Sequence, residues 1–222
     1  MIKLLIFDLD GTLADTGQDI TNALNYALEP FGVREYSLEE TKAMVGSGIS
    51  KLLESLIPDD SPVAAEMRNN SQKPEELVLS RFLEYYDNHL IDNTNAYPHV
   101  KETLSKLNDY KKTVLSNKRE VYSKRVLEGL DIVQHFDLVW GSDSVREKKP
   151  SPVPVLDMME HFSVPKDETV LVGDSNYDVE AGKAAGIKVI GVTYGFRSRK
   201  FLKGADYIID SFDEVLNILS SL

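Results

Sequence analysis

The amino-acid sequence predicts an α/β fold, a doubly wound and mostly parallel sheet with a helical insert after the first strand. After residue 97, short apolar segments alternate with segments of helical period, which is typical of strands alternating with helices. Residues 15–94 break this alternation and have an almost entirely helical pattern. We therefore expect an α/β core at residues 1–14 and 95–222 and a helical domain at residues 15–94.

The core elements are expected in a regular order along the chain. The apolar run Leu4–Phe7 predicts the first strand. Further strands are predicted at 112–116, 136–140, 169–172, 189–192 and 207–209. Helices are predicted at 100–108, 120–130, 153–162 and 178–185. A last helix would follow the capping box that Ser211 forms with Glu214.

The insert carries its own helix signals. A first stripe of apolar residues at helical spacing ends at Gly32 and comprises Ile20, Leu24, Ala27, Leu28 and Phe31. A capping box of Ser37 and Glu40 would begin a second helix. Apolar and aromatic residues between 77 and 86 indicate a longer helix, and the polar segments 58–62 and 69–73 are expected to be loops.

The segment Asp8-Leu-Asp10-Gly11-Thr12 follows the first predicted strand directly. Carboxylates at the end of a buried strand are costly unless a cation or hydrogen-bond donors compensate them. Because Asp8 and Asp10 are two apart on an extended segment, their side chains start on the same side. Gly11 allows a sharp turn and Thr12 adds a hydroxyl, so the segment suits a hard cation and a phosphate. The alternative is an Asx-type turn, in which an aspartate bonds only its own backbone.

Later strand ends and the loops near them carry more polar residues: Ser116, Asn117, Lys118, Lys148, Lys149, Asp174, Ser175 and Asp178. Ligands of open parallel sheets bind beyond the carboxyl ends of the strands, so these residues are expected to gather near Asp8 and Asp10. Together they offer carboxylates for a metal, cations for an anion, and hydroxyl and amide donors for oxygen atoms.

Composition narrows the function classes. The 222 residues include 25 basic and 36 acidic ones, and the net charge of −11 argues against a nucleic-acid-binding face. No apolar run is long enough to span a bilayer, and the first residues lack the pattern of a signal peptide. Without cysteine there are no disulfides and no thiolate sites. We expect a cytoplasmic monomer or homodimer with neither nucleic acid nor a membrane as partner.

Four of these segments resemble, in the same order, the motifs of haloacid dehalogenase (HAD) superfamily phosphatases. They are Asp8-x-Asp10-Gly-Thr12, Ser116 within Val114-Leu-Ser-Asn-Lys118, Lys149 opening Lys-Pro-Ser-Pro152, and Gly173-Asp174-Ser-x-x-Asp178. The resemblance covers essentially the whole chain and implies a Rossmann-like catalytic core with the helical insert as its cap domain. Within the superfamily, the cap loop Val45-Gly-Ser-Gly48 and the segment 173–186 look most like those of phosphoglycolate phosphatases.

The resemblance implies a mechanism for phosphomonoester hydrolysis. Asp8 would attack phosphorus to give an aspartyl-phosphate. Asp10 would protonate the leaving alkoxide and later take a proton from the hydrolytic water. Phosphate oxygens would be bound by Ser116 and Lys149, with Thr12 and Asn117 contributing to substrate binding.

The resemblance also implies Mg²⁺ as the cofactor. The Asp8 carboxylate, the Asp10 backbone carbonyl and Asp174 would hold the ion, with waters completing the shell. Asp178 would bind the metal directly or support its shell. The metal would offset the repulsion between an anionic nucleophile and an anionic phosphate.

The expected partner is a small phosphorylated metabolite, with 2-phosphoglycolate or a similar small phosphorylated acid first. The cap suggests this, because Lys51 follows the loop Gly46-Ser47-Gly48 and could face a substrate carboxylate. The alternatives are a phosphatase for pyrophosphate, a sugar phosphate or a nucleotide, and a mutase resembling β-phosphoglucomutase. That mutase shares the core residues, but its typical Ser-Arg-Glu cap segment is missing here.

Two other classes fit less well. The dehalogenase branch lacks the second aspartate of the first motif, so Asp10 argues against it. A regulatory protein on an inactive scaffold would be expected to have lost Asp8, Asp10, Lys149 or Asp174, and all four are present.

Overall fold

The computed structural model describes residues 1–58 and 60–222, so Asp59 of the predicted loop 58–62 lies outside the described residues. The chain forms two compact units. The first comprises Met1–Asp15 and Asn95–Leu222, and the second comprises Thr16–Thr94. None of the described helices has the length and apolar composition that a membrane crossing needs.

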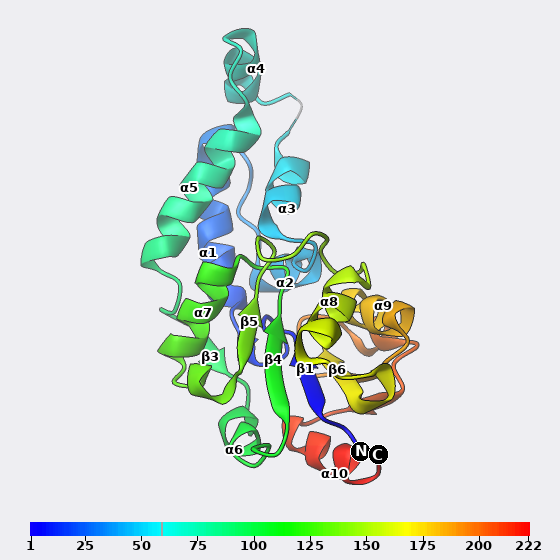
Figure 1. Ribbon diagram of the computed structural model, residues 1–222. Helices are drawn as coiled ribbons and strands as arrows, with labels where there is room; N and C mark the ends of the chain where they lie inside the picture. The colour runs from blue at the N-terminus through cyan, green and yellow to red at the C-terminus, as the bar shows by residue number, and fades with distance from the viewer. Residues whose placement is uncertain (59) are drawn as a thin grey trace. The chain divides into compact units, whose positions relative to one another are not determined.

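The first unit is built on a six-stranded sheet, ordered β5-β4-β1-β6-β7-β8 (Figure 1). Every neighbouring pair in it is parallel, which confirms the predicted α/β fold class. The strands are β1 (Leu4–Phe7), β4 (Lys111–Leu115), β5 (Leu138–Trp140), β6 (Thr169–Gly173), β7 (Lys188–Val192) and β8 (Tyr207–Ile209). Fully buried β1 lies between β4 and β6, so its end is surrounded by the ends of two other strands.

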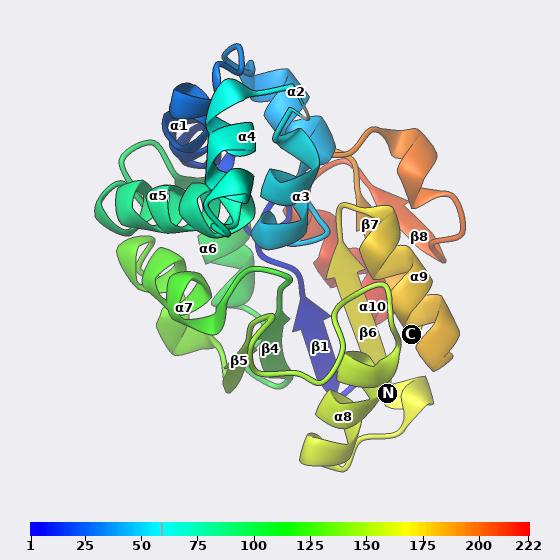
Figure 2. The same cartoon turned by 90° about the horizontal axis from the view of Figure 1, so that it is seen from above.

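Helices cover both faces of this sheet: α6 (Val100–Leu104), α7 (Glu120–Gly129), α8 (Val153–Phe162), α9 (Asn176–Ala185) and α10 (Val215–Ser220). Figure 2 shows α8 and α9 together beside β1 and β6. On that face Leu4 and Ile6 share a buried apolar cluster with α8 and α9. The ring of Phe7 packs against Phe136 and Phe212, at centroid distances of 6.1 and 5.8 Å. Because successive strand residues point to opposite faces, β1 contributes to both cores.

The helix predicted at 100–108 is shorter than expected and ends at Leu104. Its polar residues compete for backbone carbonyls that a longer helix would use. Ser105 Oγ donates to the Glu102 carbonyl at 2.7 Å, and Asn108 Nδ2 donates to the Ser105 carbonyl at 2.8 Å. Short polar side chains that bond nearby backbone in this way favour turns over helix.

The second unit is helical, as the sequence predicts, and comprises α1 (Gly17–Leu28), α2 (Leu38–Met44), α3 (Ile49–Leu56), α4 (Pro62–Asn69) and α5 (Pro74–Asn88). α1 packs along α5. The predicted capping box at the start of α2 is confirmed, with Ser37 and Glu40 each bonding the other's backbone N–H. Gly32 ends the first helical stretch in the left-handed conformation, with φ of 70°.

The two ends of the insert are held side by side. In the first unit, β2 (Ala14–Asp15) pairs antiparallel with β3 (Asn95–Ala96). In the second unit, Asp19 of α1 is 1% exposed and accepts hydrogen bonds from Asn93 and Thr94. Its Oδ1 accepts from Asn93 Nδ2 at 2.7 Å, and its Oδ2 accepts from the Thr94 amide at 2.9 Å and hydroxyl at 2.8 Å. One buried carboxylate therefore ties the first turn of α1 to the last residues of the insert.

Replacing Asp19 with alanine is expected to lower the free energy of unfolding by about 3 kcal/mol, because the donors of buried Thr94 and of neighbouring Asn93 lose a buried, charged acceptor. A urea unfolding curve measures this loss. The exposed Glu66 of α4 provides a control, since its alanine variant should change stability by less than about 0.5 kcal/mol. Equal losses in the two variants would show that the Asp19 bonds contribute nothing to stability.

Candidate active site

The parallel register brings several predicted site residues to one edge of the sheet. Asp8 directly follows β1, Asp174 directly follows β6, and Ser116 directly follows β4. The Asp8 amide donates to the Val172 carbonyl at 2.9 Å, which continues the pairing of β1 with β6. The Ser116 amide donates to the Trp140 carbonyl at 3.0 Å in the same way. The carboxylates of Asp8 and Asp174 and the hydroxyl of Ser116 therefore lie at the ends of neighbouring strands.

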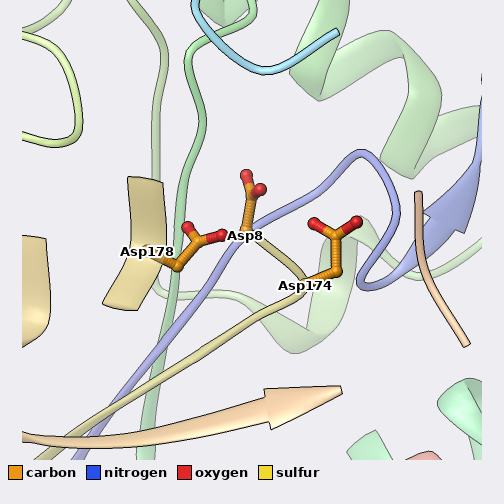
Figure 3. A group of neighbouring side chains, drawn as sticks. All are labelled: Asp8, Asp174 and Asp178. Atoms are coloured by element: carbon orange, nitrogen blue, oxygen red, sulfur yellow. The ribbon is translucent and has the colours of Figure 1, made fainter. Parts of the chain in front are cut away.

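Three carboxylates gather at this edge. Asp8, Asp174 and Asp178 each offer an oxygen within 4.8 Å of the other two. Figure 3 shows Asp8 between the other two side chains, with the Asp178 carboxylate directed toward it. Asp174 and Asp178 are almost fully buried. A cluster of buried carboxylates requires compensating positive charge.

Lys149 provides part of that charge. Its Nζ lies 3.0 Å from Asp8 Oδ1 and 2.6 Å from Asp178 Oδ1, and the residue is 4% exposed. Burial lowers the pKa of Lys149, but the carboxylates of Asp178 and Asp8 outweigh it and raise the pKa overall. The side chain is therefore a fixed ammonium between two carboxylates.

Asp178 holds the ammonium of Lys149, and Asn117 holds the backbone of the same residue. While Asp178 Oδ1 contacts the ammonium, its Oδ2 accepts from the Ser175 amide at 3.1 Å and the Ser175 hydroxyl at 2.6 Å. Asn117 Nδ2 donates to the backbone carbonyl of Lys149 at 2.9 Å. The side chain of Asn117 thus joins the loop after β4 to Lys149, a role that the sequence did not indicate.

A second lysine pairs with Asp10. Lys118 Nζ lies 3.0 Å from Asp10 Oδ1, and the two side chains are only 8% and 12% exposed. The Lys118 backbone is held on both sides, since its amide donates to Ser116 Oγ at 3.2 Å and its carbonyl accepts from Ser142 at 2.8 Å. The sequence grouped Lys118 with the polar strand ends but predicted no role for it.

Asp174 is enclosed by two backbone segments that approach it closely. Its Oδ2 accepts from the Phe196 amide at 2.6 Å. Gly11 has φ of +85°, and a Cβ there would lie 2.2 Å from Asp174 Oδ2. A Cβ on Gly195 would lie 2.3 Å from both Asp174 Cβ and the Gly11 carbonyl. Only glycine fits at these positions, so the loop after β7 belongs to the site, although sequence reasoning missed it.

The electrostatics of the cluster fit a divalent cation. Burial raises the pKa of Asp8 to about 7, helped by the carboxylates of Asp178 and Asp10 and opposed by Lys149. Burial, with the charges of Asp8 and Asp178, also raises the pKa of Asp174. When all four carboxylates are ionised, the ammonium groups of Lys149 and Lys118 leave an excess of two negative charges. Mg²⁺ prefers oxygen ligands, and its two positive charges would balance this excess.

Thr12, which follows Gly11, is fully buried. Its carbonyl accepts from the Tyr194 hydroxyl at 3.0 Å, and its amide donates to the Leu9 carbonyl at 3.2 Å. Among the described residues, Thr12 Oγ1 has no hydrogen-bond partner. A role for that hydroxyl in substrate binding stays a prediction.

The other predicted binding residues belong to the second unit: Gly46, Ser47, Gly48 and Lys51. Gly48 has φ of 92° and begins α3 as its N-cap. Lys51 is an exposed residue in the first turn of that helix. Their contact with a substrate stays a prediction.

Comparisons with known proteins agree with the resemblance. Residues 5–192 match the family model described as haloacid dehalogenase-like hydrolase. A phosphoglycolate phosphatase from Aquifex aeolicus is 35% identical over 197 residues, which cover 88% of this chain and 86% of that protein. One from Chromobacterium violaceum is 34% identical over 222 residues, covering 99% and 97%.

A crystal structure described as a predicted phosphoglycolate phosphatase from Haemophilus somnus superimposes with a TM-score of 0.87. It is 28% identical in sequence, and the match covers 98% of each chain. These relatives support a phosphatase, the enzyme class that the sequence predicts. From the family-model match and from relatives above 30% identity over nearly its full length, the chain belongs to the haloacid dehalogenase-like hydrolase family.

Proposed function

We propose that this enzyme is a Mg²⁺-dependent phosphomonoesterase that acts through an aspartyl-phosphate on Asp8, with 2-phosphoglycolate or a similar small phosphorylated acid as substrate. The observation that carries the proposal is the Asp8 carboxylate at the end of β1, within reach of Asp174, Asp178 and the Lys149 ammonium. A carboxylate nucleophile, an acidic cation site and a fixed cation for phosphate are the parts that phosphoryl transfer needs.

Asp8 is oriented for attack by its own surroundings. Its Oδ1 accepts from the Leu9 amide at 2.7 Å and contacts Lys149 at 3.0 Å. In the first step, an Asp8 oxygen forms a bond to phosphorus as the ester P–O bond breaks, and Asp10 gives its proton to the leaving oxygen. In the second step, water attacks phosphorus, Asp10 takes a proton from that water, and the bond to Asp8 breaks to release phosphate.

In this mechanism Lys149 and Ser116 bind phosphate oxygens during both steps. Lys149 keeps its charge because two carboxylates raise its pKa, so it offers a permanent cation. Ser116 is buried at the end of the neighbouring strand, and its hydroxyl accepts from the Lys118 amide. Preorganised donors of this kind stabilise charge that develops in a transition state.

The metal would be held by the carboxylates of Asp8 and Asp174 and by the backbone carbonyl of Asp10. When bound, it would neutralise negative charge between nucleophile and phosphate. Both oxygens of Asp178 already contact other groups, Lys149 on one side and Ser175 on the other. Asp178 therefore supports the site by fixing Lys149 and the start of α9.

The substrate class rests on the relatives, whose names specify phosphoglycolate, and on Lys51 as a cation offered by the cap. A steady-state panel with Mg²⁺ tests it, using 2-phosphoglycolate, pyrophosphate, sugar phosphates, nucleoside monophosphates and β-glucose 1-phosphate. We expect the highest kcat/KM for 2-phosphoglycolate. A much higher value for any of the other compounds would remove the substrate assignment, and conversion of β-glucose 1-phosphate to an isomer would indicate a mutase.

A further inference from the structure

In the proposed function the leaving group of the substrate lies beside Asp10, and Asp10 pairs with Lys118. This inference rests on the proposed function, in which Asp10 hands a proton to the ester oxygen. A proton donor works at a distance of roughly 2.6–3.2 Å from the atom that it protonates. Lys118 Nζ is 3.0 Å from Asp10 Oδ1, so it lies next to the same part of the substrate.

The chemistry of a phosphorylated 2-hydroxy acid matches that position. In 2-phosphoglycolate the carboxylate carbon is two bonds from the ester oxygen, so the carboxylate lies within a few ångströms of the proton donor. A second buried ammonium near Asp8, that of Lys149, lies between Asp8 and Asp178. That places Lys149 beside the attacking carboxylate, whereas Lys118 is beside the group that departs.

We propose that Lys118 binds the carboxylate of the leaving group and so makes this enzyme prefer phosphorylated acids over neutral phosphate esters. An ammonium has three donors, so Lys118 can contact Asp10 and a substrate carboxylate together. Bonds from its own amide to Ser116 and from Ser142 to its carbonyl fix the Lys118 backbone, which favours a defined contact. Recognition of the acid group then begins in the α/β unit itself, in addition to any contact from Lys51.

Two matched esters test this proposal: 2-phosphoglycolate and the phosphate ester of glycolamide, in which a neutral amide replaces the carboxylate. For Lys118→Met we expect kcat/KM on 2-phosphoglycolate to fall about 10- to 100-fold, the range for losing a charge-assisted hydrogen bond, mainly through a higher KM. The value for the amide ester should fall about tenfold less, because it shares any disturbance of Asp10 but its amide makes no charged pair with Lys118.

Two further variants sharpen the test. Lys118→Gln keeps a donor that can bond Asp10 but removes the charge, so it should show the same selective loss, and it serves if Lys118→Met does not fold. The control Lys106→Met removes an exposed lysine that precedes β4, at the opposite end of that strand from Lys118, and should leave both esters unaffected.

The outcomes separate this inference from the proposed function. If the wild-type enzyme hydrolyses both esters and the Lys118 variants slow both equally through kcat, Lys118 only positions Asp10 and the inference is overturned. If the wild-type enzyme hydrolyses neither ester, the proposed function fails and the inference fails with it. A selective loss on 2-phosphoglycolate supports both.

Discussion

Asp8→Asn is expected to lower kcat on phosphomonoesters by at least about 10⁴-fold, the scale seen when a covalent nucleophile is removed. Asparagine has nearly the same size as aspartate, but its neutral amide is a far weaker nucleophile. The fold should survive, because burial raises the pKa of Asp8 and shows that the ionised carboxylate is costly there. Steady-state kcat with Mg²⁺, together with the melting temperature, measures both parts of the prediction.

The matched control for this variant is Asp167→Asn, which makes the same chemical change at an exposed position before β6. That variant should keep wild-type kcat. Turnover by Asp8→Asn above about one per cent of wild type would contradict the assignment of Asp8 as nucleophile. A large fall in melting temperature would instead show that the charge of Asp8 is needed for folding.

Asp174→Asn is expected to raise the Mg²⁺ concentration for half-maximal activity by more than about 100-fold. Loss of an indirect supporting partner typically costs 10- to 100-fold in metal affinity, and a direct ligand should cost more. Asparagine retains an oxygen for the Phe196 amide but removes one of the negative charges that favour a divalent cation. A Mg²⁺ titration of kcat measures this effect, and chelation of the metal should abolish turnover in both proteins.

A readout that does not depend on turnover completes this test. Because an ion that binds only the folded state stabilises it, Mg²⁺ should raise the melting temperature of the wild-type protein and raise it less in Asp174→Asn. Asp167→Asn again serves as the control and should match wild type. An unchanged Mg²⁺ dependence in Asp174→Asn would remove Asp174 from the metal site.

The sequence predicts those parts of the site that depend on single strands. Asp8 and Asp174 were found because each follows an apolar run, and such a run shows where a buried strand ends. Parallel pairing then places both carboxylates at one edge of the sheet, as the structure shows for the described residues. Periodicity and strand polarity were sufficient for this part of the prediction.

Contacts between loops could not be predicted in the same way. The pairing of Lys118 with Asp10 and the donation from Asn117 to the Lys149 carbonyl depend on how separate loops meet after the sheet has formed. The close approach of Gly195 to Asp174 is of the same kind. A glycine between two aromatic residues after a strand was its only signal in the sequence. The hydrophobic pattern of a sequence does not show which of its loops will be in contact.

The paired ends of the insert make the sheet insensitive to changes in the length of the inserted helical segment. Asp15 pairs with Asn95 in the first unit, and Asp19 bonds Asn93 and Thr94 in the second. The two ends of the inserted chain, which we call the neck, are therefore held together by their own bonds. The entropy of closing a flexible loop grows only with the logarithm of its length. A neck closed by its own bonds therefore makes the length of the inserted chain almost irrelevant to the sheet. Whole helices beyond the neck can therefore be inserted, deleted or exchanged while the strands of the sheet keep their register.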